Sequence, residues 1–211
     1  MNRIVSESER VEAFAATART YSVLSPVGTP PKVTQKQAAA RLESLDGKTV
    51  YLVDCRFDDS IELLKQVEAW FAAHMPGVTT RMVSLSATYQ KDDPKTWEEI
   101  KQNGDAAIIG VGHCSNCAPA VTTHAITLET KYGMPTVALH TDKFDKVVAS
   151  VAKMAGLPQA PRSFVPQPVM GKTAAELAAY VNGSNPITGR PVMQEVVQAL
   201  TSALDGVHAG R

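Results

Sequence analysis

Two of the three cysteines lie close together in a pattern that supports thiol chemistry. Cys114 and Cys117 enclose Ser115 and Asn116, so the four residues form a C-x-x-C motif. Cysteines at this spacing form redox-active pairs, supply half of a zinc site, or are two small buried residues that share a turn by accident. We expect the motif at a strand-to-helix turn, where free backbone N–H groups and the positive end of the helix dipole stabilise a thiolate. A thiolate is the form that acts as nucleophile or metal ligand.

Three further residues could complete a site around this pair. Cys55 directly follows the apolar segment 50–54, and it could join the pair or pack as a small hydrophobic residue. His113 precedes Cys114 and could act as a base or be a polar turn residue. His140 ends another apolar segment, and a histidine there could bind a ligand or transfer a proton.

The elements that must position these residues alternate along the chain. Short apolar segments predict buried strands, and segments with apolar residues at helical spacing predict helices between them. Strands joined through helices by short loops form a parallel sheet. We therefore predict a single doubly wound, flavodoxin-like α/β domain with strand order 2-1-3-4-5. The predicted strands are 50–54, 79–85, 106–111, 136–140 and 163–165, and the predicted helices are 61–75, 96–102, 118–132 and 144–154.

This strand order places the candidate residues at one edge of the sheet. The first and third strands are neighbours in it, and the crevice outside their carboxyl ends is the usual ligand site. Cys55 follows the first strand and Cys114 follows the third, so we expect both near this crevice. The expected ligand is a small molecule.

The core domain is expected at residues 48–170, between two extensions. Residues 1–47 are expected to hold an N-terminal helix, at 7–20, and a Pro/Gly-rich connection. Residues 171–211 are expected to form a helical C-terminal extension, with helices at 173–180 and 194–204. Extended tails of this kind favour a homodimer or a complex with a related subunit.

Composition excludes two classes of partner. The 211 residues include 21 basic and 21 acidic side chains, and this zero net charge argues against nucleic acid as the main partner. No apolar run approaches the roughly 20 residues that span a bilayer, and the N-terminal segment lacks the apolar core of a signal peptide. We therefore expect a cytoplasmic protein with no membrane partner. In that reducing compartment, cysteines are expected as thiols or metal ligands rather than structural disulfides.

Several motifs together resemble one known family. Residues 110–145, GVGHCSNCAPAVTTHAITLETKYGMPTVALHTDKFD, are similar to the UGSC family of bacterial proteins. In that family a glycine-rich strand end leads into selenocysteine or cysteine, then Gly, Ser and Cys. The likeness includes the segment 133–137 with the later Phe144, the turn at 165–168, and the early stretch 25–30.

This resemblance implies a chemical role for the cysteine pair. Cys114 occupies the selenocysteine position and Cys117 that of the partner cysteine. Selenium at the first position in relatives implies nucleophilic chemistry there, because a selenolate is ionised at neutral pH. The chain departs from the family pattern at the inner Ser-Asn pair, at His113, where an acidic residue is usual, and at Cys55, where relatives tend to have Asn. The departures at His113 and Cys55, both near the expected site, suggest a specialised member with a different substrate or a metal.

The sequence thus predicts an enzyme and leaves two alternatives open. In the first hypothesis Cys114 is the thiolate nucleophile, Cys117 resolves or assists, and His113 or His140 is the base. The reaction is a substitution, a reductive cleavage or a lyase-type step on a small polar molecule, which makes the chain a cysteine-dependent lyase, reductase or hydrolase. If Cys55 faces Cys114, a two-thiol racemisation is a variant of this hypothesis.

The alternatives use the cysteines without nucleophilic chemistry. Cys55, Cys114 and Cys117 could hold a soft or borderline metal ion such as zinc, in a catalytic or structural site. No other cofactor is predicted. In the third hypothesis the chain is a non-catalytic subunit of a complex and its cysteines are merely packed.

Overall fold

The computed structural model describes residues 22, 24–25, 28, 32–86 and 90–202. The helix expected at 7–20 and the end of the one expected at 194–204 lie outside the described residues. The chain divides into two compact units, residues 1–32 and residues 33–211. All the helices and strands below belong to the second unit.

Five strands form one parallel sheet in the predicted order, β2-β1-β3-β4-β5. All seven residues of the central strand, AAIIGVG, are buried, as expected for a strand covered on both faces. The flavodoxin-like fold is therefore confirmed. The strands are β1 (Thr49–Asp54), β2 (Thr79–Ser84), β3 (Ala106–Gly112), β4 (Thr136–Thr141) and β5 (Arg162–Val165).

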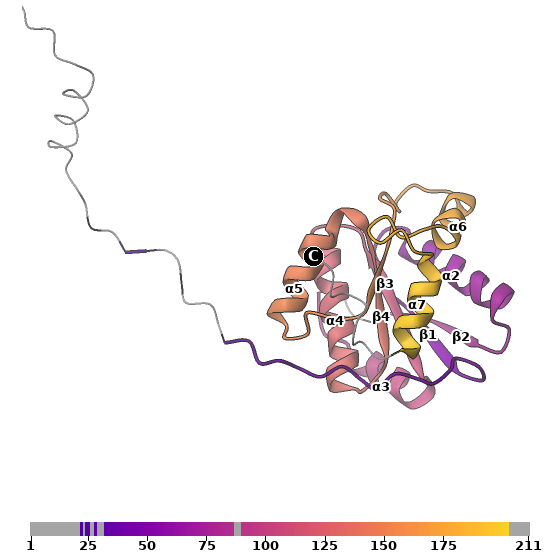
Figure 1. Ribbon diagram of the computed structural model, residues 1–211, viewed down its shortest axis with the longest axis horizontal. Coiled ribbons are helices and arrows are strands. Elements are labelled where there is room, and N and C mark those ends of the chain that lie inside the picture. Colours follow the sequence, from indigo (N-terminus) through magenta and orange to yellow (C-terminus); the bar gives the residue numbers. More distant parts are fainter. Residues whose placement is uncertain (1–21, 23, 26–27, 29–31, 87–89, 203–211) are drawn as a thin grey trace, which may run out of the picture. The chain divides into compact units, whose positions relative to one another are not determined.

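Helices cover both faces of this sheet (Figure 1). They are α2 (Ser60–His74), α3 (Pro94–Asn103), α4 (Cys117–Lys131), α5 (Asp145–Met154), α6 (Ala174–Asn182) and α7 (Val192–Thr201), with a 3-10 turn, η1 (Asp142–Phe144). Because side chains alternate along a strand, Leu52 of β1 packs in the same core as α2, α6 and α7. Its neighbour Val53 faces the other core, which contains residues of α3 and α4.

The junction between β3 and α4 depends on a glycine. A Cβ at Gly112 would lie 2.1 Å from Nδ1 of His140 and 3.0 Å from the Cα of Ala118, so a larger residue does not fit. The pairing of β3 with β4 is irregular between Ile109 and Gly112, and the peptide between Gly110 and Val111 is cis. Glycine thus lets α4 begin directly against the end of the central strand, which places the C-x-x-C motif at the carboxyl edge of the sheet.

Candidate functional site

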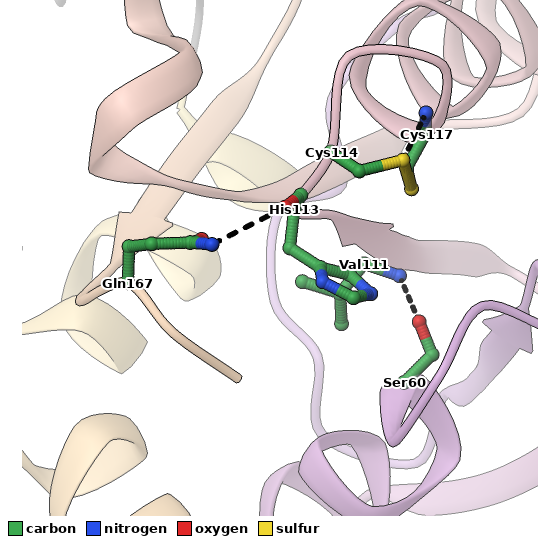
Figure 2. The surroundings of a disulfide bond; sticks show 6 residues. All are labelled: Ser60, Val111, His113, Cys114, Cys117 and Gln167. Atoms are coloured by element: carbon green, nitrogen blue, oxygen red, sulfur yellow. Dashed lines mark hydrogen bonds between the residues drawn. A yellow bond between two sulfur atoms is a disulfide. The ribbon is translucent and has the colours of Figure 1, made fainter. Parts of the chain in front are cut away.

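Cys114 and Cys117 are joined by a disulfide bond at the start of α4 (Figure 2). Their Cα atoms are 4.9 Å apart. Cys114 is half-buried, whereas Cys117, the first residue of the helix, is only 2% exposed. The two sulfurs therefore differ in access, and a molecule from solvent reaches Cys114 first. The free thiols expected from the sequence are not found at these two positions in this structure.

The start of α4 also stabilises negative charge on one of the two sulfurs. The backbone N–H of Cys117 donates a hydrogen bond to Sγ of Cys114, with 3.0 Å between the atoms. N–H groups in the first turn of a helix have no intrahelical partner, and the helix dipole adds positive potential there. In the reduced state both effects favour the thiolate of Cys114, the nucleophilic form of cysteine.

A cavity of about 380 Å³ opens beside the disulfide. Three loops at the carboxyl edge of the sheet form its walls: the loops after β1, β3 and β5. This is the crevice between the first and third strands in which doubly wound proteins bind ligands. The lining residues are Arg56, Phe57, Asp58, His113, Cys114, Cys117, Gln167, Pro168 and Met170, and the Gln167–Pro168 peptide is cis.

The loop after β1 is held by the carboxylate of Asp54. One oxygen accepts a hydrogen bond from the backbone N–H of Arg56 at 2.8 Å, and the other accepts one from the Ser84 hydroxyl at 2.9 Å. The first contact closes a turn of the kind that aspartate favours, and Arg56 adopts a positive φ of 62° within it. The turn leaves the side chains of Arg56 and Asp58 exposed at the cavity.

The loop after β5 is tied to both other walls. The Gln167 backbone N–H donates to Oδ1 of Asp142 at 2.9 Å, and its side-chain amide donates to the carbonyl oxygen of His113 at 3.4 Å (Figure 2). The backbone N–H of Gly171 donates to the carboxylate of Asp59 at 2.7 Å. These bonds between distant parts of the chain fix the shape of the cavity.

His113 contributes a neutral imidazole to the cavity. Burial lowers the pKa of His113, although Asp58 and Asp59 act in the opposite direction. The ring turns away from the disulfide toward Ser60 and Val111, whose N–H donates to the Ser60 hydroxyl (Figure 2). The rings of His113 and Phe57 are perpendicular, with 6.2 Å between centroids. Nε2 of His113 is buried and has no hydrogen-bond partner among the described residues.

His140 lies apart from the cavity. Its ring is fully buried between β4 and α4, where Nε2 lies 3.4 Å from the hydroxyl of Thr122. Burial, and to a smaller extent Arg162, lowers the pKa of His140 to about 3. The ring is not among the side chains that line the cavity with Cys114. Of the two histidines predicted as bases, only His113 lines the cavity beside the cysteine pair, and its ring points away from the disulfide (Figure 2).

Cys55 also does not line the cavity. Its side chain is fully buried in the core that contains Trp97 and Leu85, and its backbone N–H donates to the carbonyl of Gly110 at 3.0 Å. Burial, and secondarily the charge of Asp54, raises the pKa of the Cys55 thiol well above its ordinary value. Cys55 is therefore a protonated free thiol that packs as a small hydrophobic residue.

No three His, Cys, Asp or Glu side chains in the described part of the chain are grouped as metal ligands. In the oxidised state Cys114 and Cys117 bind each other, and a metal site would need both as thiolates. A metal ion at Cys55, Cys114 and Cys117 therefore stays a prediction, and the geometry adds no support to it.

Sequence reasoning missed most of the cavity wall. Arg56 and Asp58 lie in a loop with no recognisable motif. Gln167 lies in the turn at 165–168 that carries part of the family resemblance, but no role was predicted for its side chain. The predicted strand order did contain one indication that these residues could contact a ligand. All three residues directly follow strands whose carboxyl ends lie at the same edge as the cysteines, where ligand contacts are expected.

The fold and the site define a doubly wound α/β protein with a C-x-x-C disulfide at the topological switch point of its sheet. The chain belongs to the UGSC family, whose family model matches residues 22–202. A comparison with curated proteins found no match. Among the described residues, no helix combines the length and apolar character needed to cross a membrane.

Proposed function

We propose that this protein is a dithiol reductase that cleaves a small-molecule disulfide in the cavity beside Cys114. The observation that carries the proposal is the bond between a half-buried cysteine and a buried one at the cavity wall. This asymmetry suits a pair in which one thiol meets the substrate and the other completes the reaction. Cys114 is the attacking residue and Cys117 the resolving residue.

The reaction proceeds by two exchanges. The Cys114 thiolate attacks one sulfur of the substrate, a mixed disulfide forms, and the other half of the substrate leaves as a thiolate with the electron pair of the broken bond. The Cys117 thiolate then attacks Sγ of Cys114 and expels the second half. The substrate gains two electrons, and the protein is left with the Cys114–Cys117 disulfide.

The start of α4 assists these steps. The N–H bond to Sγ of Cys114 favours the attacking thiolate. The His113 ring turns away from the two sulfurs (Figure 2), so the proton that a thiol must lose before it attacks goes to water. The leaving thiolates take protons from water.

An external thiol must return the disulfide to the dithiol. We place the protein in the cytoplasm, where monothiol and dithiol reductants supply the two electrons. The fully buried Cys55 takes no part, because its thiol stays protonated and does not line the cavity.

The stoichiometry of the thiols tests this proposal. The full chain is reduced, freed of reductant without oxygen, and incubated with excess 2-hydroxyethyl disulfide to completion. Thiols counted in denaturant should fall from three per chain to one, the thiol of Cys55. Cys55→Ala is the matched control and should lose both of its remaining thiols. A chain that keeps three thiols, or that retains a substrate half on the wild-type protein, would contradict the proposal.

A further inference from the structure

Two opposite charges stand at the cavity, two residues apart. The side chains of Arg56 and Asp58 are exposed, line the cavity, and form no ion pair with any residue that the structure describes. If each charge were paired with a charge on a neighbouring loop, it would already be neutralised and would be an ordinary surface feature. Here both charges are available to a bound molecule, and each favours the opposite charge on it.

Two polar atoms at the cavity also lack a partner. Because the carbonyl of His113 can only accept, the Gln167 amide must direct its N–H toward it. Oε1 of Gln167 is thereby turned away, and it is buried with no hydrogen-bond partner among the described residues. Nε2 of His113 is in the same condition, and the His113 side chain is more than nine-tenths buried. Buried polar atoms are normally hydrogen-bonded, so two unpaired ones in residues that line the cavity favour a polar ligand there.

Apolar side chains line the same cavity. Phe57 lies between Arg56 and Asp58 in the sequence, and Pro168 and Met170 from the loop after β5 add to this apolar wall. Met170 is 58% exposed, although methionine is usually buried in folded proteins. The wall suits one or two methylene groups next to the sulfur that Cys114 attacks.

We propose that the substrate is a zwitterionic disulfide of the amino-acid type, with a carboxylate and an ammonium group near its sulfur. The carboxylate pairs with Arg56, and the ammonium group pairs with Asp58 and donates to Oε1 of Gln167. This inference rests on the proposed reductase function and names its substrate class. Cleavage follows the same two exchanges: the substrate disulfide gains two electrons and the Cys114–Cys117 dithiol becomes a disulfide.

Four small disulfides that carry different charged groups test this assignment. L-cystine carries both groups, cystamine only the ammonium groups, 3,3′-dithiodipropionate only the carboxylates, and 2-hydroxyethyl disulfide neither. The initial rate of oxidation of the reduced full chain is measured with each at equal concentration. Each rate is divided by the rate of the same disulfide with dithiothreitol, because this cancels differences in the pKa of the leaving thiol. After this division, cystine should react at least about tenfold faster than the neutral disulfide, with the singly matched compounds between them.

Charge variants assign each group to its residue. Arg56→Gln should lower the rates with cystine and dithiodipropionate about tenfold relative to the neutral disulfide, and Asp58→Asn should do so for cystine and cystamine. Arg81→Gln, at an exposed arginine of β2 that does not line the cavity, is the matched control. For each variant, the rate with a charged disulfide is divided by the rate with 2-hydroxyethyl disulfide. This ratio cancels any effect of the substitution on the reactivity of the cysteine pair itself.

The outcomes distinguish a wrong substrate class from a wrong reductase function. Equal rates for all four disulfides after division by the dithiothreitol rates, or an Arg56→Gln variant that slows all four alike, would overturn the substrate assignment and leave the reductase function standing. A dithiol that none of the four disulfides oxidises would overturn the reductase function itself.

Discussion

The backbone N–H of Cys117 lies 3.0 Å from Sγ of Cys114 and donates a hydrogen bond to it. Both residues come from one turn, yet this bond makes them unequal, because it stabilises charge on Cys114 only. Exposure acts in the same direction, since Cys114 is half-buried and Cys117 is buried. Two independent features of the turn therefore assign the attacking role to the same residue.

Cys55 should be unreactive toward alkylating reagents in the native protein. Burial and the charge of Asp54 raise the pKa of the Cys55 thiol, so this thiol stays protonated. Its side chain is also fully buried, so a reagent in solution does not reach it. In the reduced chain, iodoacetamide should alkylate Cys114 rapidly and leave Cys55 unmodified until denaturant is added. Peptide mapping after native and denatured alkylation checks this. Alkylation of native Cys55 at the rate of Cys114 would show that the packing described here is wrong.

Most of the fold could be predicted because the apolar segments are short, regular and separated by clear turns. Segment 106–111 predicted the central strand, which the structure extends by one residue to Gly112. The helix expected to begin at 118 begins at Cys117. That one residue matters, since it puts the second cysteine inside the helix and its N–H within reach of the first sulfur.

The site was harder to predict, because its geometry depends on which way side chains point. Cys55 and Cys114 do follow neighbouring strands, as predicted. The Cys55 side chain, however, packs in the core with Trp97 instead of lining the cavity. His140 likewise ends a strand at the predicted edge and is covered by α4. Strand order gives the edge of the sheet, and the direction of each side chain decides whether it meets the ligand.

Gly112 should tolerate no side chain. In Gly112→Ala the new Cβ would lie 2.1 Å from Nδ1 of His140 and 3.0 Å from the backbone of Ala118, so β3 or α4 must shift. Overpacking of this kind costs about 1–3 kcal/mol, which urea unfolding measures. Gly28→Ala, where no atom lies within 4 Å of the added Cβ, is the control. Equal stability of Gly112→Ala and the wild type would refute the close contact.

The buried His140 should make the protein less stable in mild acid. Its pKa is lowered from 6.5 to about 3 by burial and Arg162, so in this interval the unfolded chain binds a proton that the folded chain does not. Stability from this group is complete above about pH 6.5 and is lost as the pH falls toward 3, by up to about 1.4 kcal/mol per pH unit. His113, whose pKa is also lowered, acts in the same direction.

Comparison with His140→Gln isolates this contribution. The free energy of unfolding is measured by urea titration between pH 7 and pH 5 for both proteins. The wild type should lose more stability than the variant over this range, because the variant has no imidazole to protonate on unfolding. Parallel pH dependences would mean that His140 titrates normally in the folded protein.

The central claim, that Cys114 attacks and Cys117 resolves, is tested most directly by trapping the mixed disulfide. Reduced Cys117→Ser and Cys114→Ser are each mixed with L-cystine and with 2-hydroxyethyl disulfide, and their intact masses are followed with time. Cys117→Ser should rapidly gain one substrate half, on Cys114 by peptide mapping, and Cys114→Ser should gain it far more slowly. If Cys114→Ser forms its adduct as fast as Cys117→Ser does, the assignment of the two roles is wrong.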